Sequence, residues 1–226
     1  MKKNTIIKKI VFIFIALSAI LFSISMSINI ITKDKNYYYE YSQKNNITEY
    51  TGLNADKLED MYSNLIDYIY SGDESLINKD FNKREVAHML DVYKLYNLNM
   101  IVTYITSSIL IACIIYLVLS YKKKINLYNE LRYVRNAFLI ILLAIIILVG
   151  IISIDFDSAF IKFHELFFNN DLWLLNPRTD IMIRMLPQDF FMNMAIRIAK
   201  NLFVHLVVLF SIFSIILKNN KDKLRS

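Results

Sequence analysis

Two carboxylates flank a histidine in the segment REVAHMLDV. Glu85 lies three residues before His88 and Asp91 three residues after it, so on a helix either carboxylate can contact the imidazole ring or the residues beside it. Imidazole titrates near neutral pH, which suits it to general acid or general base catalysis. A surface helix with ordinary ion pairs would show the same pattern, so His88 is a candidate that needs a partner group.

A second histidine lies among aromatic residues in the segment FIKFHELFF. On a helix, Phe160, Phe167 and Phe168 share a face with His164, since they lie at i−4, i+3 and i+4. These rings could confine an apolar group beside the imidazole, although core packing or membrane anchoring would use the same residue types. The sequence therefore predicts two acid–base residues that would work together if the fold brings them close.

Composition places these histidines in a helical membrane protein. The 226 residues are 56% hydrophobic, have a mean hydropathy of +0.38, and include three glycines and two prolines. The single cysteine, Cys113, lies in an apolar run and has no partner for an intrachain disulfide or a cysteine metal site. Crossing a bilayer takes about 20 apolar residues. Four runs fit, at 10–31, 98–120, 136–154 and 191–217.

The first apolar run follows a lysine-rich start. A cleaved signal peptide would also begin with basic residues, but its apolar core is usually about 7 to 15 residues long and ends at an A-x-A-like site. The run 10–31 is longer and lacks that site. We therefore expect an uncleaved membrane anchor.

The distribution of charge predicts the orientation of the spans. Basic residues gather at 1–9, in the loop 121–135 and in the tail 218–226, and the positive-inside rule assigns these segments to the cytoplasm. The segment 32–97 has eight basic and twelve acidic residues, and 155–190 is also more acidic than basic, so both are expected outside. The formal charge of +6 is thus a topology signal, and no nucleic-acid partner is expected.

Topology then places the two histidines on the same side of the membrane. His88 lies about ten residues before the second span, and His164 about ten residues after the third. Both are expected at the outer membrane face and at similar depth.

The outer segment 32–97 is predicted to be a small α+β cap. Tyr37–Tyr41 and 46–51 are expected as two paired strands, with a turn at Gly52. Apolar residues at helical spacing predict a helix from Asn54, which can cap it, to Ile69.

Capping signals predict three further helices. Asn82 with Glu85 is a loose variant of the capping box and predicts a helix that runs directly into the second span. Asp157 or Ser158 can cap the helix of His164, and Thr179 can cap another that ends near Leu186.

These segments resemble a known family. The stretch FHELFFNNDLWLLNPRTDIMIRMLPQDFF, the upstream REVAHMLDV and the order of the four spans are similar to the bacterial lipoprotein intramolecular transacylase family. The most specific parts are the two histidine motifs and the pattern N-x-x-x-W-x-L-x-P-x-x-D from Asn169 to Asp180. One departure is Leu186-Pro187-Gln188, where the family is expected to show Phe-Pro-Glu.

The resemblance implies an all-α transmembrane four-helix bundle with a small α+β extracellular cap, in the bacterial cell membrane. It implies acyl transfer from the sn-2 position of a diacylglyceryl group to the α-amino group of the N-terminal cysteine of a lipoprotein. The partners would be a diacylated lipoprotein N-terminus and membrane lipid, with no cofactor and no metal. The catalytic residues would be His88 and His164. Residues expected to bind or orient the substrate are Glu85, Asp91, Phe160, Phe167, Phe168, Asn169 and Trp173.

Other functions remain open from the residues alone. Two histidines with carboxylates could hold zinc for a membrane hydrolase, although no H-E-x-x-H spacing occurs. A transporter would need ionisable groups inside several spans, and only His205 qualifies. A noncatalytic membrane scaffold is the third alternative, and in it Trp173 would be an interfacial anchor.

Overall fold

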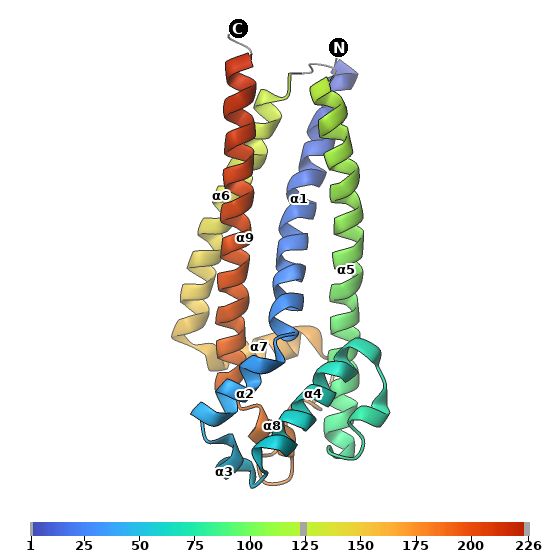
Figure 1. Ribbon diagram of the computed structural model, residues 1–226, viewed down its shortest axis with the longest axis vertical. Helices are drawn as coiled ribbons and strands as arrows, with labels where there is room; N and C mark the ends of the chain where they lie inside the picture. Colours follow the sequence, from blue (N-terminus) through green and yellow to red (C-terminus); the bar gives the residue numbers. More distant parts are fainter. Residues whose placement is uncertain (1, 123–125, 224–226) are drawn as a thin grey trace. The chain divides into compact units, whose positions relative to one another are not determined.

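The computed structural model describes residues 2–122 and 126–223, and all regular secondary structure in this part of the chain is helical (Figure 1). In chain order the elements are α1 (Lys2–Thr32), α2 (Lys35–Lys44), α3 (Ile47–Thr51), α4 (Ala55–Ser71), the 3-10 turn η1 (Glu74–Leu76), α5 (Lys83–Lys122), α6 (Tyr128–Ile154), α7 (Phe156–Phe167), α8 (Ile181–Met185) and α9 (Gln188–Lys223). The chain divides into two compact units, which are described separately.

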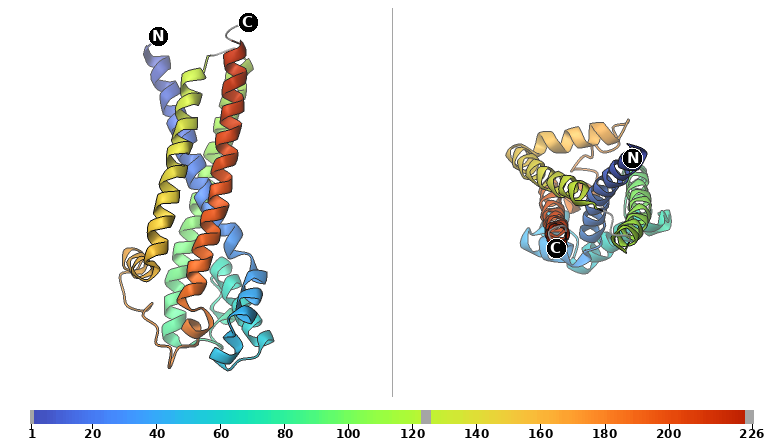
Figure 2. Two further views of the ribbon diagram at one scale, coloured as in Figure 1. Left: turned by 90° about the vertical axis from the view of Figure 1, so that its left-hand side faces the viewer. Right: turned by 90° about the horizontal axis from the view of Figure 1, so that it is seen from above.

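The first unit comprises Met1–Ser27, Ile101–Gly150 and Ile198–Ser226. Its described residues belong mainly to the four long helices α1, α5, α6 and α9, whose segments lie side by side in the end-on view of Figure 2. Each helix contributes to one apolar core, represented by Ile15, Cys113, Phe138 and Leu206.

The outward-facing surface of this unit is also apolar. On α6, for example, Ile140 is 65% exposed and Ile147 is 64% exposed. Water would penalise such a surface, whereas lipid chains cover it at little cost. Each of the four long helices contains a stretch long and apolar enough to cross a membrane. The chain is therefore a multi-pass membrane protein, and the four predicted apolar runs lie on these helices.

The second unit comprises Ile28–Met100 and Ile151–Arg197 and contains both candidate histidines. In it α2 packs against α4, and α3 packs against α8. The predicted helix α4 is confirmed: the Asn54 side chain accepts a hydrogen bond of 2.8 Å from the Lys57 backbone N–H and caps it. Gly72 ends this helix in the left-handed conformation, with φ of 73°.

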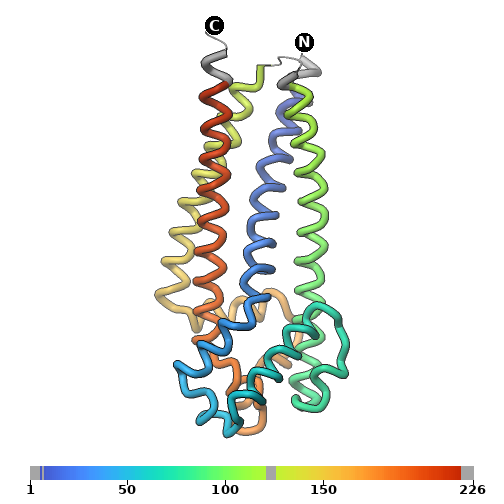
Figure 3. Tube along the Cα trace, in the orientation of Figure 1, coloured from blue at the N-terminus to red at the C-terminus, as the bar shows by residue number. Residues whose placement is uncertain are grey.

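The tyrosine-rich segment after α1 is helical, so the predicted pair of strands is wrong. The residues expected as strands form α2 and α3 instead, and no strand occurs among the residues that the structure describes (Figure 3). The Asp34 side chain accepts a hydrogen bond from the Tyr37 N–H and caps α2. Tyr38 and Tyr41 lie one helical turn apart and are both buried, whereas a strand would direct them to opposite faces.

An aromatic cluster explains why this segment is helical. The Phe190 ring lies 5.8 Å from the Tyr38 ring, 5.0 Å from the Tyr41 ring and 6.0 Å from the Tyr62 ring, measured between centroids. The Tyr41 hydroxyl also donates a 2.6 Å hydrogen bond to the Asp189 carboxylate. Packing against α4 and the start of α9 thus outweighs the β preference of tyrosine, and the segment 32–97 is helical rather than α+β.

Candidate active site

Helix α5 begins with a reciprocal set of hydrogen bonds. The Asn82 side-chain oxygen accepts from the backbone N–H groups of Arg84 and Glu85, at 2.9 and 3.1 Å. The Glu85 carboxylate accepts in return from the Asn82 N–H at 2.7 Å, so the predicted capping box is confirmed. The helix then continues without a break to Lys122, as predicted, and carries His88 in its second turn.

Helix α7 carries the second histidine, and its capping residue is Asp155. The Asp155 side chain accepts a 3.0 Å hydrogen bond from the Ser158 N–H. The predicted caps, Asp157 and Ser158, already lie inside the helix. The reason is that α6 ends only one residue before Asp155, which is the single non-helical residue between the two helices. His164 lies in the last turn of α7.

The two histidines, one on α5 and one on α7, face each other. The ring centroids of His88 and His164 are 6.1 Å apart, and their planes are inclined by 36°. Each residue is only 8% exposed. The Phe168 ring packs against both imidazoles, with centroid distances of 5.4 Å to His88 and 5.5 Å to His164. The structure therefore brings together the two residues that the sequence singled out.

Other aromatic rings surround the His164 imidazole. Trp173 stacks on it with a centroid distance of 4.8 Å and an angle of 26°, and the Phe160 ring lies at 4.3 Å. Phe163 contacts it edge-on at 5.4 Å, a contact that the helical-face argument could not find because the two residues are adjacent. Phe167 was expected here but instead packs against Phe163 and is 48% exposed.

The two carboxylates near His88 bind other groups. The Glu85 side chain, in a residue only 1% exposed, accepts a second hydrogen bond of 2.6 Å from the Met182 N–H, which ties α5 to α8. Asp91 accepts a 2.8 Å hydrogen bond from the side-chain amide of Asn170. These carboxylates therefore hold the segments around the histidine instead of binding its ring.

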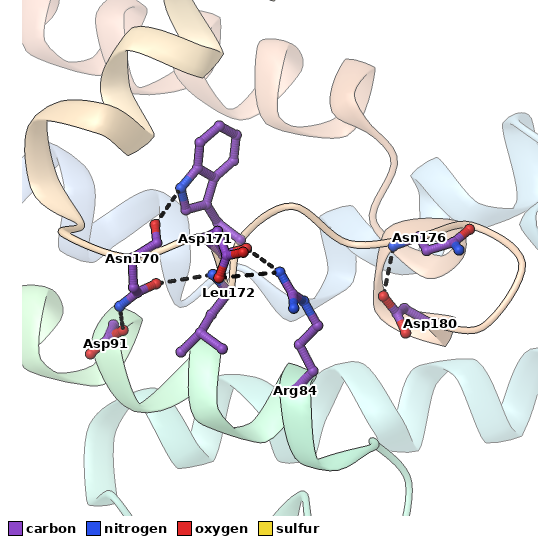
Figure 4. A network of polar contacts seen from close by, with 8 residues as sticks. Arg84, Asp91, Asn170, Asp171, Leu172, Asn176 and Asp180 are labelled. Carbon is purple, nitrogen blue, oxygen red and sulfur yellow. Dashed lines mark hydrogen bonds and ion pairs between the residues drawn. The ribbon is translucent and has the colours of Figure 1, made fainter.

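Asn170 was not predicted as a site residue, although its neighbour Asn169 was expected to bind or orient the substrate. Asn169 is exposed, whereas Asn170 contacts α5 through Asp91 (Figure 4). Arg84 was also missed by sequence reasoning; its guanidinium donates to the Asp171 carbonyl oxygen and lies 3.6 Å from the Asp171 carboxylate. Its position at i−4 from His88, on the same helix face, is the signal that could have identified it.

The start of α8 differs from the prediction by one residue. Asp180 is the capping residue and Thr179 precedes it, donating a 2.9 Å hydrogen bond to the Asp180 carboxylate. That carboxylate also accepts from the Asn176 N–H at 2.6 Å and from the Asn82 side-chain amide at 2.9 Å. Asp180 thus closes the loop that follows Trp173 through its contact with Asn176 (Figure 4). Its contact with Asn82 attaches the loop to the start of α5.

Both imidazoles favour their neutral form. His88 precedes the predicted apolar run 98–120 by about ten residues, and His164 follows the run 136–154 by about ten, so both histidines lie outside these runs. Burial, together with the facing His164, lowers the pKa of His88 to about 4, while Asp91 opposes this shift. Burial also lowers the pKa of His164, and the hydrogen bond to Phe160 partly offsets it.

The hydrogen bonding of the two rings differs. The Nδ1 atom of His164 lies 2.7 Å from the Phe160 carbonyl oxygen. A carbonyl can only accept, so Nδ1 carries the proton in the neutral ring and Nε2 keeps a lone pair. The Nδ1 atom of His88 is buried without a hydrogen-bond partner among the described residues. The two rings can thus accept or donate a proton within one enclosed site, which suits general acid–base chemistry.

The side chains around the two histidines do not form a metal site among the described residues. Within residues 2–122 and 126–223, no three histidine, cysteine or acidic side chains come together in a way that could hold a metal ion. The carboxylates closest in sequence to His88 are engaged by N–H and amide donors, as described above.

The chain was compared with known families and structures. A sequence model of the family described as lipoprotein intramolecular transacylase Lit matches residues 12–191. No curated protein sequence matches the chain. The solved structure of lipoprotein intramolecular transacylase Lit from Bacillus cereus is similar, with a TM-score of 0.82, 23% identity, and coverage of 95% of this chain and 98% of that one.

Two further structures of the Bacillus cereus protein carry a single histidine substitution. The variant with arginine gives a TM-score of 0.79 at 23% identity and covers 98% of this chain and 97% of that one. The variant with alanine gives the same TM-score and identity, with coverage of 97% and 98%. These likenesses show a common fold. Because the family model spans most of the sequence and includes both histidine segments, the chain belongs to the lipoprotein intramolecular transacylase family and is an acyltransferase.

Proposed function

We propose that the protein moves an acyl chain within one lipid-modified substrate, a lipoprotein whose N-terminal cysteine carries a diacylglyceryl group. The acyl chain leaves the sn-2 ester oxygen and forms an amide with the α-amino group of the same cysteine. The product is a lyso-form lipoprotein. The observation that carries the proposal is the enclosed pair of imidazoles, His88 and His164, in a chain of the transacylase family.

The reaction needs proton transfer but no change of oxidation state. The amine nitrogen attacks the ester carbonyl carbon, a C–N bond forms, and the C–O bond to the glyceryl oxygen breaks. One proton leaves the nitrogen and one reaches the glyceryl oxygen, so a pair of acid–base groups is sufficient and no cofactor takes part. Since donor and acceptor belong to one molecule, holding them in contact lowers the barrier further.

His164 is the better placed general base of the pair. Its Nδ1–H group is held by the Phe160 carbonyl, so the Nε2 lone pair is available to take the proton from the attacking amine. Burial lowers the pKa of His164, which keeps this lone pair free at neutral pH.

His88 is assigned to the oxyanion and the leaving group. With its pKa lowered to about 4, it rests as a neutral imidazole that can donate an N–H group to the oxygen on which charge develops. A permanently protonated His88 would conflict with this lowered pKa. The proton that His164 takes from the amine is instead the one that reaches the departing glyceryl oxygen.

The surface of α7 favours a lipid substrate. Phe163, Leu166 and Phe167 are 44%, 76% and 48% exposed, while His164 on the same helix is buried. This helix follows α6, a candidate membrane span, after a single residue. An amphipathic helix with aromatic residues next to a span is typical of the membrane–water interface, where acyl chains and a polar cysteine can both reach the site.

The orientation follows from the charges. We place both chain ends and the segment 121–135 in the cytoplasm, and 32–97 and 155–190, with the active site, at the outer membrane face. Cysteine accessibility labelling in intact cells would test this orientation. Labelling of a cysteine introduced near residue 126 from outside the cell would contradict it.

The activity is tested with the full chain in proteoliposomes and a synthetic diacylated lipopeptide. The product has the same mass as the substrate, so mild alkali is needed: it removes both ester-linked chains of the substrate, whereas the product keeps one chain as an amide. Mass spectrometry after this treatment should show acyl transfer for the wild type and none for His88→Ala or His164→Ala.

Two results would contradict the proposal. Retention of normal transfer by either histidine variant would remove that residue from the reaction. Loss of one acyl chain without alkali, with release of free fatty acid, would identify a hydrolase instead. Both variants should be checked for membrane insertion and thermal stability, so that unfolding is not mistaken for a catalytic defect.

A further inference from the structure

Two contacts of α5 flank His88 and hold the same loop. Arg84 lies at i−4 and Asp91 at i+3, so both share the face of the helix that carries His88. The Arg84 guanidinium donates to the Asp171 carbonyl oxygen, and the Asp91 carboxylate accepts from the Asn170 side-chain amide at 2.8 Å (Figure 4). The loop after α7 is thus fastened to α5 on both sides of the histidine.

Asn170 connects this attachment to the other histidine. Its side-chain oxygen accepts a 3.0 Å hydrogen bond from the Leu172 N–H and forms the turn of the loop. Its backbone carbonyl accepts a 3.0 Å hydrogen bond from the indole N–H of Trp173. Trp173 in turn stacks on the imidazole of His164. One residue therefore touches the helix of His88 and also fixes the ring that covers His164.

The ends of this loop are held by the buried Phe168 ring and by the hydrogen bonds of Asp180, but its middle has no such support among the described residues. Residues 168–180 contain no helix, so neither backbone ladder nor helical packing determines where the indole lies. Asn170 and Asp171 are exposed, so the contacts with Arg84 and Asp91 hold this part of the loop in place of burial.

We propose that Asn170 is a positioning residue: through Asp91 on one side and Trp173 on the other, it sets the placement of His164 relative to His88. The inference rests on the proposed function for its effect on catalysis, although the geometry that it describes can be measured without substrate. Asn170 acts through other residues and is not assigned a contact with the substrate.

A reciprocal exchange of side chains tests the contact with Asp91. Asn170→Asp keeps an oxygen for the Leu172 N–H but places two carboxylates 2.8 Å apart, where repulsion breaks the attachment. Asp91→Asn with Asn170→Asp restores a donor and an acceptor with their roles reversed and with the wild-type net charge. We expect the single variant to lose about tenfold to hundredfold in kcat at neutral pH, with a smaller change in KM, because misplacement of about 1 Å can cost that much. The double variant should recover most of the loss.

Lys94 provides the matched control for the charge of Asp91. The Lys94 ammonium contacts the same carboxylate at 3.2 Å, and the Lys94 side chain is 63% exposed to solvent. Lys94→Gln removes this ion pair and leaves the Asn170 contact intact, so kcat should stay within about a factor of two of the wild type.

Trp173 gives a readout that does not depend on catalysis. It is the only tryptophan among the 226 residues, so fluorescence excited at the red edge of the absorption band reports this ring alone. A protonated imidazole stacked on an indole quenches its emission, and a pH titration therefore follows His164. The wild type and the double variant should show the same quenching amplitude, whereas Asn170→Asp should show much less.

The outcomes separate the two proposals. Equal kcat and equal quenching in wild type and Asn170→Asp would overturn the positioning role. Failure of the double variant to regain both signals, while it remains folded, would also overturn it. If the histidines were not catalytic, His88→Ala and His164→Ala would keep transfer activity. The quenching amplitude would still fall in Asn170→Asp and recover in the double variant, so the positioning role would stand.

Discussion

The imidazoles of His88 and His164 lie 6.1 Å apart, although 76 positions separate them in the sequence. At this distance, and in a buried site, a proton on one ring disfavours a proton on the other. The pair therefore takes up at most one proton beyond those of the two neutral rings, which suits the proposed transfer of one proton from the amine to the glyceryl oxygen.

The first prediction concerns the pH dependence of catalysis. Burial lowers the pKa of His164 and, with the facing ring, lowers that of His88 to about 4. The neutral rings needed for proton transfer should thus persist on acidification beyond the ordinary histidine pKa of about 6.5. We expect the α-amino group of the lipopeptide, with an ordinary pKa of about 7.7 to 8.0, to set the acidic limb of kcat/KM, with no second ionisation near pH 6.5. A second ionisation at pH 6.5 or above in this limb would contradict the lowered pKa of the base.

The second prediction concerns stability. A histidine whose pKa is lowered by folding binds its proton more readily in the unfolded chain, so acid favours unfolding. The contribution of His88 should be present above about pH 6.5 and should be lost as the pH falls toward about 4. Thermal unfolding in detergent should show a midpoint that decreases over this window. His88→Phe should flatten the dependence, and an unchanged slope in that variant would assign it to other groups.

The third prediction concerns the ring that covers His164. Trp173→Phe keeps an aromatic face and should lose less than about tenfold in kcat, whereas Trp173→Ala removes the stack and should lose more. Transfer assays with both variants at saturating lipopeptide would measure this. Equal activity of the alanine and phenylalanine variants would show that stacking on the imidazole is dispensable.

The fourth prediction concerns Glu85. Each of its oxygens accepts from a different backbone N–H, of Asn82 and of Met182, and the residue is 1% exposed. Glu85→Gln would turn an amide N–H₂ toward one of these donors, so it should destabilise the protein by about 1–3 kcal/mol, as a buried unsatisfied donor does. The measurement is the thermal unfolding midpoint. A variant of normal stability but without activity would instead place Glu85 in the chemistry.

The fifth prediction concerns the remaining histidine. His205 lies in the first unit, where its Nδ1 atom is 3.2 Å from the Ser27 hydroxyl. The same hydroxyl is 2.7 Å from the Ser23 carbonyl oxygen and can donate to it, so Ser27 keeps a partner without His205. His205→Ala should retain activity within about a factor of two and lose about 1 kcal/mol of stability. A loss of transfer activity comparable to that of His88→Ala would give His205 a functional role inside its span, as in the transporter alternative.

Local rules predicted several elements because the decisive contacts lie close in the sequence. The capping box of Asn82 and Glu85 and the cap and end of α4 each involve residues within one turn of one another. The pairing of the histidines was also predictable, since apolar spans and charge bias constrain where each histidine lies.

The errors arose where contacts distant in sequence decide. The tyrosines of α2 were expected as a strand because no local rule reveals that Phe190 would pack against them. Asn170 was not identified, because no local rule shows which of two adjacent asparagines faces Asp91. Asp155 was missed as a cap because its role depends on α6 ending immediately before it.

The buried carboxylate of Glu85 has a consequence for synthesis of the protein. Two side chains at the start of α5 bind groups that are synthesised about 100 residues later. Glu85 accepts from the Met182 N–H, and Asn82 donates to the Asp180 carboxylate. A nascent chain that has reached only Trp173 already contains both histidines but lacks these partners. We therefore expect the active site to mature only after α8 has left the ribosome, so that incomplete chains in the membrane stay inactive.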